Sequence, residues 1–253
     1  MGIAAALVLS LVMIPAPVAP EYAALGDSYA AGVGTGNSGG GCGRSTSSYP
    51  ALFKDAHSPA SFLFPACSGA TVRDVLDRQV PSLSAETGLV TVTVGGNDIG
   101  FADVMTTCSL GLDRACVRAV ERANGLTRGE LPGRLARLFA GIKAAAPGAK
   151  VVLLGYPRLF ESRSCSGGLS EAKRAAVNGG ADLLAEVMAS SAGAAGVAFV
   201  DVRKVFAGHG ICGANPWVRP VTSPLRDSYH PNRLGYGGYL RALESVVSGV
   251  TVG

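Results

Sequence analysis

Three short segments of this chain carry side chains that can perform acyl transfer. Ser28 lies near the start in the segment GDSY, Asn97 lies in the segment GGND, and His230 follows Asp227 by three positions in the segment DSYHPN. Acyl transfer needs a nucleophile, a hydrogen-bond donor to the oxyanion and a general base, which a hydroxyl, an amide and an imidazole can supply. No segment is decisive alone, but the three together predict a serine ester hydrolase.

Ser28 is the predicted nucleophile. A serine that follows a strand and Gly-Asp often only caps a helix, but Gly26 permits a tight turn that would expose the hydroxyl at the start of a helix. There the helix dipole and nearby N–H groups favour negative charge. Asp27 is expected to stabilise this turn. Ser28 does not lie in a Gly-x-Ser-x-Gly segment such as that of the α/β-hydrolases, which disfavours that fold.

Two further residues are candidate donors to the oxyanion. Asn97 would donate through its side-chain amide, although an asparagine that leaves a strand also commonly forms a turn. Gly69, in the segment CSGAT, would donate through its backbone N–H, or else is only a loop glycine before a helix. A disulfide at Cys67 would hold that loop still, which preorganised donors require.

His230 is the predicted general base, and Asp227 is the residue expected to orient it. A carboxylate three positions earlier can hold the imidazole in one tautomer and stabilise the imidazolium. His57 and His209 have no such neighbour and are interpreted as surface residues. The sequence therefore favours a triad of Ser28, His230 and Asp227.

The elements that must position these residues follow from the apolar pattern. Continuous apolar runs suit the strands of a parallel sheet that is covered on both faces, and they lie at residues 22–25, 89–94, 150–154 and 197–202, with 61–64 as a fifth strand. Helical spacing appears at residues 71–79, 131–146, 170–190 and 234–247. Strands that alternate with helices predict a three-layer α/β/α domain with a central, mostly five-stranded parallel sheet.

This architecture would bring the candidate residues together. In open parallel sheets the site lies at the carboxyl ends of the strands. Ser28 follows the first strand and Asn97 follows the strand at residues 89–94, so both should emerge at one edge of the sheet. His230 must reach that edge from the loop before the last helix.

Composition limits the class of protein. The chain has 253 residues, of which 48% are hydrophobic and 16% charged, and this suits one well-buried domain over residues 21–253. The formal net charge of +4 comes without a block of Lys or Arg, and there is no nucleic-acid-binding motif. Because no Cys-x-x-Cys occurs and the three histidines do not fall at ligand spacing, we expect no metal and no other cofactor.

The N-terminal segment and the cysteines indicate export. Residues 1–20 are almost wholly apolar and are interpreted as a signal peptide or hydrophobic leader, although they lack the usual Lys or Arg. A leader that stays uncut would hold the protein at the cell envelope. Six cysteines behind a leader suggest disulfides in an oxidising compartment. Cys108 and Cys116 are close enough in the sequence to close a local loop. Cys42 with Cys67, and Cys165 with Cys212, would close longer loops. The number of cysteines alone does not determine which of them pair.

The segments GDSY, GGND and Asp-x-x-His, in this order, resemble the SGNH hydrolases, also called the GDSL esterase/lipase family, from about residue 21 to the C-terminus. This resemblance implies a flavodoxin-like α/β/α sheet and metal-free ester hydrolysis, with Ser28 as nucleophile and His230 as general base. The backbone N–H groups of Ser28 and Gly69, together with the Asn97 amide, would form the oxyanion hole.

Within this family, the chain is most similar to secreted actinobacterial lipases and phospholipases. Their disulfides join cysteines in sequential order, which implies the pairs Cys42–Cys67, Cys108–Cys116 and Cys165–Cys212. Some of them orient the histidine with a main-chain carbonyl. The alternative to a triad is therefore a Ser28–His230 dyad, with the carbonyl of Ser228 or Asp227 as the orienting group.

Three functions stay open. The first is a lipase or esterase that acts on acyl glycerols, phospholipids or simple acyl esters, and an apolar pocket at Phe101, Leu110 and Leu112 would favour it, although these residues suit a core equally well. The second is an esterase that removes acetyl groups from polysaccharide, and the third is a non-catalytic binding protein of the cell surface. We expect a monomer whose partners are a small-molecule or lipid ester and, transiently, a lipid surface.

Overall fold

Five parallel strands form the central sheet in the order β2-β1-β3-β4-β5. They are β1 (Glu21–Gly26), β2 (Phe62–Leu63), β3 (Thr87–Thr93), β4 (Lys150–Leu154) and β5 (Ala198–Val200). This computed structural model describes residues 20–165 and 168–247, so the expected leader lies, except for Pro20, outside the described residues. The sheet confirms the predicted fold class.

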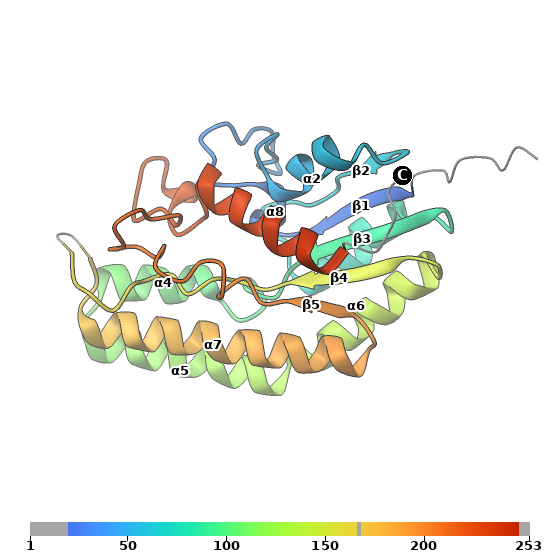
Figure 1. Ribbon diagram of the computed structural model, residues 1–253. Coiled ribbons are helices and arrows are strands. Elements are labelled where there is room, and N and C mark those ends of the chain that lie inside the picture. Colours follow the sequence, from blue (N-terminus) through green and yellow to red (C-terminus); the bar gives the residue numbers. More distant parts are fainter. Residues whose placement is uncertain (1–19, 166–167, 248–253) are drawn as a thin grey trace, which may run out of the picture.

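Helices cover both faces of the sheet, as Figure 1 shows. On one face lie α2 (Tyr49–His57) and α8 (Arg233–Val247). On the other lie α4 (Phe101–Leu110), α5 (Asp113–Gly129), α6 (Leu131–Ala145) and α7 (Glu171–Ala194). Three of these, α6, α7 and α8, were predicted from the sequence, whereas α2, α4 and α5 were not.

The predicted helix at residues 71–79 is helical but irregular. A short α-helix, α3 (Val72–Asp74), passes into a π-helical turn, η1 (Val75–Gln79), and then into the 3₁₀ turn η2 (Val80–Ser82). A π-helical turn shifts the direction of the side chains that follow it, and such turns are frequent at functional sites. Here the turn ends at Gln79, whose buried side chain reaches the end of β1.

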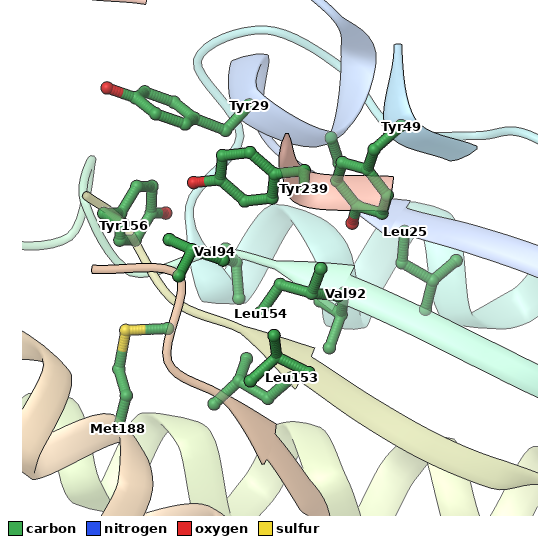
Figure 2. Close-up of a cluster of buried hydrophobic side chains, with 14 of the residues drawn as sticks. Leu25, Tyr29, Tyr49, Val92, Val94, Leu153, Leu154, Tyr156, Met188 and Tyr239 are labelled. Atoms are coloured by element: carbon green, nitrogen blue, oxygen red, sulfur yellow. The ribbon is translucent and has the colours of Figure 1, made fainter. Parts of the chain in front are cut away.

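The hydrophobic core lies on both faces of the sheet (Figure 2). Strand residues such as Val92 and Leu154 are fully buried between Tyr239 of α8 and Met188 of α7. Each such side chain contributes roughly 1.5–3 kcal/mol through burial. The continuous apolar runs in the sequence therefore reflect strands with no solvent-exposed face.

The order of the strands fixes where a site can form. The chain passes from β1 outward to β2 on one side, and from β3 outward to β4 and β5 on the other. The direction of winding thus switches between β1 and β3, and open α/β sheets bind ligands in the crevice outside such a switch point. The segments that follow β1 and β3 carry Ser28 and Asn97.

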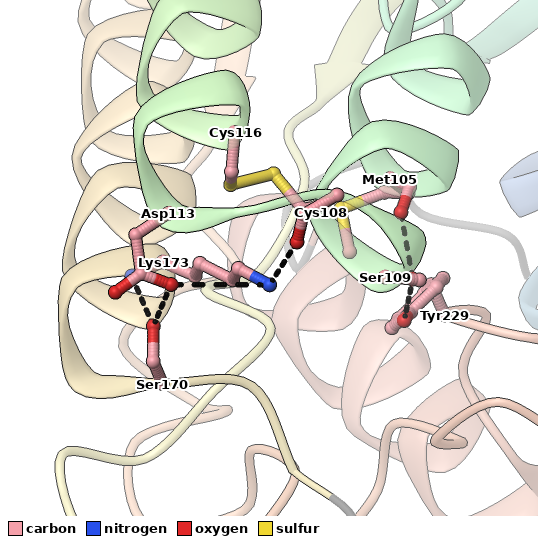
Figure 3. Close-up of a disulfide and its surroundings, with 9 residues drawn as sticks. Met105, Cys108, Ser109, Asp113, Cys116, Ser170, Lys173 and Tyr229 are labelled. Carbon is pink, nitrogen blue, oxygen red and sulfur yellow. Dashed lines mark hydrogen bonds and ion pairs between the residues drawn. A yellow bond between two sulfur atoms is a disulfide. The ribbon is translucent and has the colours of Figure 1, made fainter.

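Three disulfides, Cys42–Cys67, Cys108–Cys116 and Cys165–Cys212, fasten the loops at this end of the molecule. The pairing is the sequential one that the family resemblance implies. Figure 3 shows the second of them, which joins the end of α4 to the first turns of α5. Within residues 20–165 and 168–247, no helix has the length and apolar character needed to cross a bilayer.

Candidate active site

The turn after β1 places Ser28 at the first position of α1 (Ser28–Ala31). Gly26 has a φ of +128°, and a Cβ there would come within 2.2 Å of the Thr93 carbonyl oxygen, so only glycine fits. The side chain of Gln79 satisfies both backbone groups of Gly26, accepting from its N–H at 2.7 Å and donating to its carbonyl at 2.9 Å. The Asp27 carboxylate accepts the Tyr29 N–H at 2.9 Å and so stabilises the turn, as expected.

His230 lies directly against Ser28. The distance between His230 Nε2 and Ser28 Oγ is 2.7 Å, and His230 Nδ1 lies 2.9 Å from the main-chain oxygen of Ser228. A carbonyl oxygen can only accept, so Nδ1 carries the proton of the neutral ring and Nε2 is free to accept the Ser28 hydroxyl proton. The structure thus unites a hydroxyl and an imidazole that are 202 positions apart.

The expected contact between Asp227 and the imidazole is not formed. Asp227 is buried, but its carboxylate makes no hydrogen bond to His230, and among the described residues its Oδ1 atom has no hydrogen-bond partner, only a distant ion-pair contact with Arg226 at 3.9 Å. The chain turns at Tyr229, which has a φ of +63°. This local geometry presents the Ser228 carbonyl to Nδ1, and the arrangement is the dyad that was the alternative to a triad.

Burial keeps the imidazole uncharged. It lowers the pKa of His230 to about 4, while the hydrogen bond to Ser228 and the charge of Asp227 act in the opposite direction. Desolvation disfavours the imidazolium because a charged ring loses more hydration than a neutral one. At neutral pH the ring is therefore in the form that can accept a proton.

Asn97 faces the same cavity as Ser28 and holds the loop that contains Gly69. Its Nδ2 donates to the Ala70 carbonyl at 2.9 Å and retains a second hydrogen. On the other side of Gly69, the Cys67 N–H donates to the Gly26 carbonyl at 3.0 Å. In the part of the chain that the structure describes, the backbone N–H groups of Ser28 and Gly69 donate to no other group. These are the groups that the sequence predicts as oxyanion donors.

Asp98 fixes this loop from the next position. Its side chain is almost fully buried, and it accepts the Val72 N–H at 2.9 Å and the Arg134 guanidinium at 3.0 Å. The carboxylate therefore ties the start of α3 to the end of β3. Because α3 follows the Gly69 loop directly, this bond limits the freedom of that loop.

An apolar cavity runs from Ser28 and Asn97 into the helical layer. It holds about 720 Å³ of empty space when its open mouth is counted, and it passes between α4, α5 and α7. Phe101 lines it, as the sequence suggested. Leu110 and Leu112 do not, because they lie at the turn between α4 and α5 with 85% and 66% of their surface exposed.

Tyr156 is a site residue that the sequence reasoning missed. Its hydroxyl donates to the Asp27 carboxylate and accepts the Gly96 N–H at 3.1 Å, so it joins the turn that carries Ser28 to the segment of Asn97. Burial raises the pKa of Asp27 to about 7. The sequence did contain a signal for this residue. Tyr156 follows β4 by two positions and therefore emerges at the same edge of the sheet as Ser28.

The other two histidines, His57 and His209, lie outside the site formed around Ser28 and His230. His57 packs on Phe53 and pairs with Glu244, while His209 stacks on Trp217 with ring centroids 3.7 Å apart. Both are half-buried rather than fully on the surface. Among residues 20–165 and 168–247, no three His, Cys, Asp or Glu side chains are grouped so that they could hold a metal ion.

Comparison with known proteins shows the family of this chain. The GDSL-like Lipase/Acylhydrolase family matches residues 24–237. A lipase of Streptomyces rimosus is 46% identical over 92% of this chain and 89% of its own length. The crystal structure of phospholipase A1 from Streptomyces albidoflavus NA297 is also 46% identical, has a TM-score of 0.88, and is covered over 99% of its chain and 90% of this one.

A more distant likeness concerns the fold alone. An acetylxylan esterase from Geobacillus stearothermophilus superposes with a TM-score of 0.54 at 16% identity, over 92% of this chain and 95% of that one. The family match and the two relatives at 46% identity are far more specific. The chain therefore belongs to the GDSL-like lipase and acylhydrolase family and is a carboxylic ester hydrolase.

Proposed function

We propose that this protein is a secreted lipase that cleaves long-chain acyl esters of lipids through an acyl-enzyme on Ser28. The observation that carries the proposal is the apolar cavity, which opens beside Ser28 and Asn97 and continues between α4, α5 and α7. A pocket for acetate alone would need no such extension. The similarity to a lipase and to a phospholipase A1 supports lipid esters as the substrate class.

In the first half of the reaction, Ser28 becomes acylated. His230 Nε2 takes the hydroxyl proton while Ser28 Oγ attacks the ester carbonyl, and the Ser228 carbonyl holds the Nδ1–H of the resulting imidazolium. The N–H groups of Ser28 and Gly69 and the amide of Asn97 stabilise the oxyanion. His230 then gives its proton to the departing alkoxide, and the alcohol leaves.

In the second half, water completes hydrolysis. His230 removes a proton from water, the hydroxide attacks the acyl carbonyl, and the same donors stabilise the second oxyanion. Collapse of this intermediate breaks the bond to Ser28 Oγ, which regains its proton from His230. The products are the free fatty acid and the unchanged enzyme.

Exposed leucines beside the site support work at a lipid surface. Leu110, Leu112 and Leu225 have 85%, 66% and 76% of their surface exposed. Ser109 at the end of α4 bonds to the Tyr229 hydroxyl at 2.7 Å, so the turn that carries Leu110 lies against the loop that carries His230 (Figure 3). Export, which the three disulfides support, would bring the enzyme to lipid outside the cell.

Replacement of the nucleophile tests the mechanism. We expect Ser28→Ala to abolish hydrolysis of p-nitrophenyl esters and labelling by a fluorophosphonate, because no other group can form the acyl-enzyme. The melting temperature should stay within a few degrees of the parent protein, since only one hydroxyl is removed. Full activity of this variant would refute the mechanism.

The substrate class has a separate test. We expect kcat/KM on p-nitrophenyl esters to rise from acetate to long acyl chains, and phospholipid vesicles to release fatty acid. Activity on acetate alone, together with release of acetate from acetylated polysaccharide, would refute the lipase proposal and favour a carbohydrate esterase. A protein that is neither labelled nor active on any of these esters would be a binding protein.

A further inference from the structure

Two consecutive residues at the start of α1 contact two consecutive residues of the loop that carries His230. Ser28 Oγ lies 2.7 Å from His230 Nε2, and the hydroxyl of Tyr29 donates to the Tyr229 carbonyl at 2.6 Å. The ring of Tyr29 also packs against the imidazole, with ring centroids 5.1 Å apart. Tyr29 thus contacts this loop right beside the reacting pair, while its own proton is committed to a main-chain carbonyl.

The turn at Tyr229 sets the direction of the Ser228 carbonyl. Tyr229 has a φ of +63°, a conformation that bulky residues rarely adopt and that persists only where neighbouring contacts hold it. Two planar peptide groups meet at this residue. The first carries the Ser228 carbonyl and the Tyr229 N–H, and the second carries the Tyr229 carbonyl and leads to His230. The angle between the two planes therefore decides whether the Ser228 carbonyl faces Nδ1.

Each of these two planes is held by one bond from outside the loop. The Tyr229 N–H donates to the Arg219 carbonyl at 2.9 Å, which fixes the first plane. The Tyr29 hydroxyl fixes the second, and within the residues that the structure describes the Tyr229 carbonyl accepts no other hydrogen bond. Without that hydroxyl the two planes could turn relative to each other, and the Ser228 carbonyl would no longer be held against the ring.

Tyr29 is itself fixed in place. Its N–H donates to the Asp27 carboxylate at 2.9 Å, and its ring packs against Tyr156 and Tyr239 with ring centroids 5.0 and 6.3 Å apart (Figure 2). Burial raises the pKa of Tyr29 well above its usual value, so the hydroxyl keeps the proton that it donates. The donor is therefore in position before any substrate binds.

We propose that Tyr29 is a positioning residue for the reaction: its hydroxyl holds the turn at Tyr229, so that the Ser228 carbonyl keeps the proton on Nδ1 and leaves Nε2 free to accept from Ser28. The inference rests on the proposed mechanism and deepens it. It assigns to the residue after the nucleophile part of the orienting role that a carboxylate has in a triad.

The kinetic test compares two variants that each lose one buried hydroxyl. Tyr29→Phe frees the Tyr229 carbonyl, and Tyr239→Phe frees the Gly155 carbonyl, to which Tyr239 donates at 2.8 Å. Both should lose melting temperature to a similar extent, since each leaves one buried acceptor without its donor. We expect kcat on p-nitrophenyl esters to fall by about tenfold to a hundredfold in Tyr29→Phe alone, with KM unchanged, because a misplaced base acts only on the transition state.

A spectroscopic test follows the tautomer directly. In protein labelled with ¹⁵N-histidine, the signals of His230 are those lost in His230→Ala. We expect the parent and Tyr239→Phe to show the Nδ1–H form, and Tyr29→Phe to show a substantial share of the Nε2–H form. A merely structural role for Tyr29 would not change the tautomer. A folded Tyr29→Phe variant that keeps either the parental kcat or the parental tautomer would overturn the inference.

A rescue variant gives a second result, should Tyr29→Phe fold poorly. Replacement of Tyr29 by p-aminophenylalanine restores an N–H donor at the position of the hydroxyl. We expect this variant to recover the Nδ1–H form and most of kcat. If it folds like the parent but recovers neither, the hydroxyl does not act as a donor to the loop and the inference fails.

Failure of this inference is distinguishable from failure of the proposed function. Tyr29→Phe should still be labelled by a fluorophosphonate at Ser28, but more slowly than the parent. Labelling at the parental rate, in a variant with the parental tautomer, would refute the role of Tyr29 alone. Activity that survives in Ser28→Ala would refute the mechanism on which both proposals rest.

Discussion

Ser28, His230 and the Ser228 carbonyl form a chain of hydrogen bonds in which a peptide dipole occupies the place that a carboxylate takes in a triad. A carbonyl fixes the tautomer as well as a carboxylate does, because it also only accepts. It stabilises the imidazolium less, because it carries no full charge. The low pKa of His230 is the consequence of burial without such a charge in contact.

Replacement of Asp227 distinguishes a dyad, in which a carbonyl orients His230, from a triad, in which a carboxylate does so. We expect Asp227→Asn to keep kcat within about tenfold of the parent, because the carboxylate makes no hydrogen bond to the ring. Loss of an aspartate that does bond to the imidazole costs about 10⁴ in kcat in serine proteases. Initial rates on a p-nitrophenyl ester measure the effect, with the melting temperature as a control for folding. A loss near that larger figure, in a variant that is fully folded, would restore the triad.

The pH dependence of activity follows from the same residue. His230 must be neutral to accept the Ser28 proton, and burial lowers its pKa to about 4. Activity is therefore present above this pKa and is lost as the pH falls through it. We expect the acidic limb of kcat/KM to lie well below 6.5, the value of a free imidazole. A limb near pH 7 would instead indicate that Asp27 controls the rate, since its pKa is raised to about 7.

At the scale of elements, the site depends on segments that hold one another at the carboxyl ends of β1, β3 and β4. Gln79, at the end of η1, bonds to both backbone groups of Gly26, and Tyr156, after β4, joins Asp27 to Gly96. These bonds are formed before substrate arrives. Preorganised donors are effective because they need no rearrangement as charge develops in the transition state.

Asp98 provides a test of this preorganisation. In Asp98→Asn, an amide donor would face either the Val72 N–H or the Arg134 guanidinium, so one of the two bonds is lost. We expect kcat to fall about tenfold with little change in KM, because the oxyanion donors act mainly in the transition state. Asp77→Asn is the matched control, since Asp77 is half-exposed and pairs with the exposed Arg73. Equal kinetics in the two variants would contradict this role for Asp98.

At the scale of the whole molecule, three disulfides close loops of very different length. The two bonded cysteines are 8 residues apart in Cys108–Cys116, 25 in Cys42–Cys67 and 47 in Cys165–Cys212. A crosslink that closes a longer loop removes more entropy from the unfolded chain. On that basis the last disulfide contributes about 4 kcal/mol and the shortest about 2.5 kcal/mol.

Removal of each disulfide in turn should reveal this order of their contributions to stability. We expect the double variant Cys165→Ser/Cys212→Ser to lose about 8–16 °C in melting temperature, and Cys108→Ser/Cys116→Ser about 5–10 °C. The second variant should nevertheless lose more activity on long-chain esters, because its disulfide joins two helices that wall the cavity. Scanning calorimetry and the ester series measure the two effects. A larger loss of melting temperature in Cys108→Ser/Cys116→Ser, together with a larger loss of long-chain activity in Cys165→Ser/Cys212→Ser, would contradict this division of roles.

The sequence by itself determined the local features. Gly26 before Asp27 and Ser28 indicated the turn that carries Ser28, because only glycine adopts its backbone conformation there. Uninterrupted apolar runs indicated strands buried on both faces, and these became β1, β3, β4 and β5. The positions of Ser28 and Asn97 after two of them placed both residues at one edge of the sheet, since parallel strands share the direction of their carboxyl ends.

Only the tertiary structure decided which groups meet. Asp227 stands three positions before His230 in the sequence, yet the turn at Tyr229 presents the Ser228 carbonyl instead, because backbone dihedral angles rather than spacing set the direction of a side chain. The exposure of Leu110 and Leu112, the reach of Tyr156 to Asp27, and the contact of Tyr29 with Tyr229 likewise depend on how the elements pack. Each is a contact between elements distant in the chain, and no local pattern of residues encodes such distances.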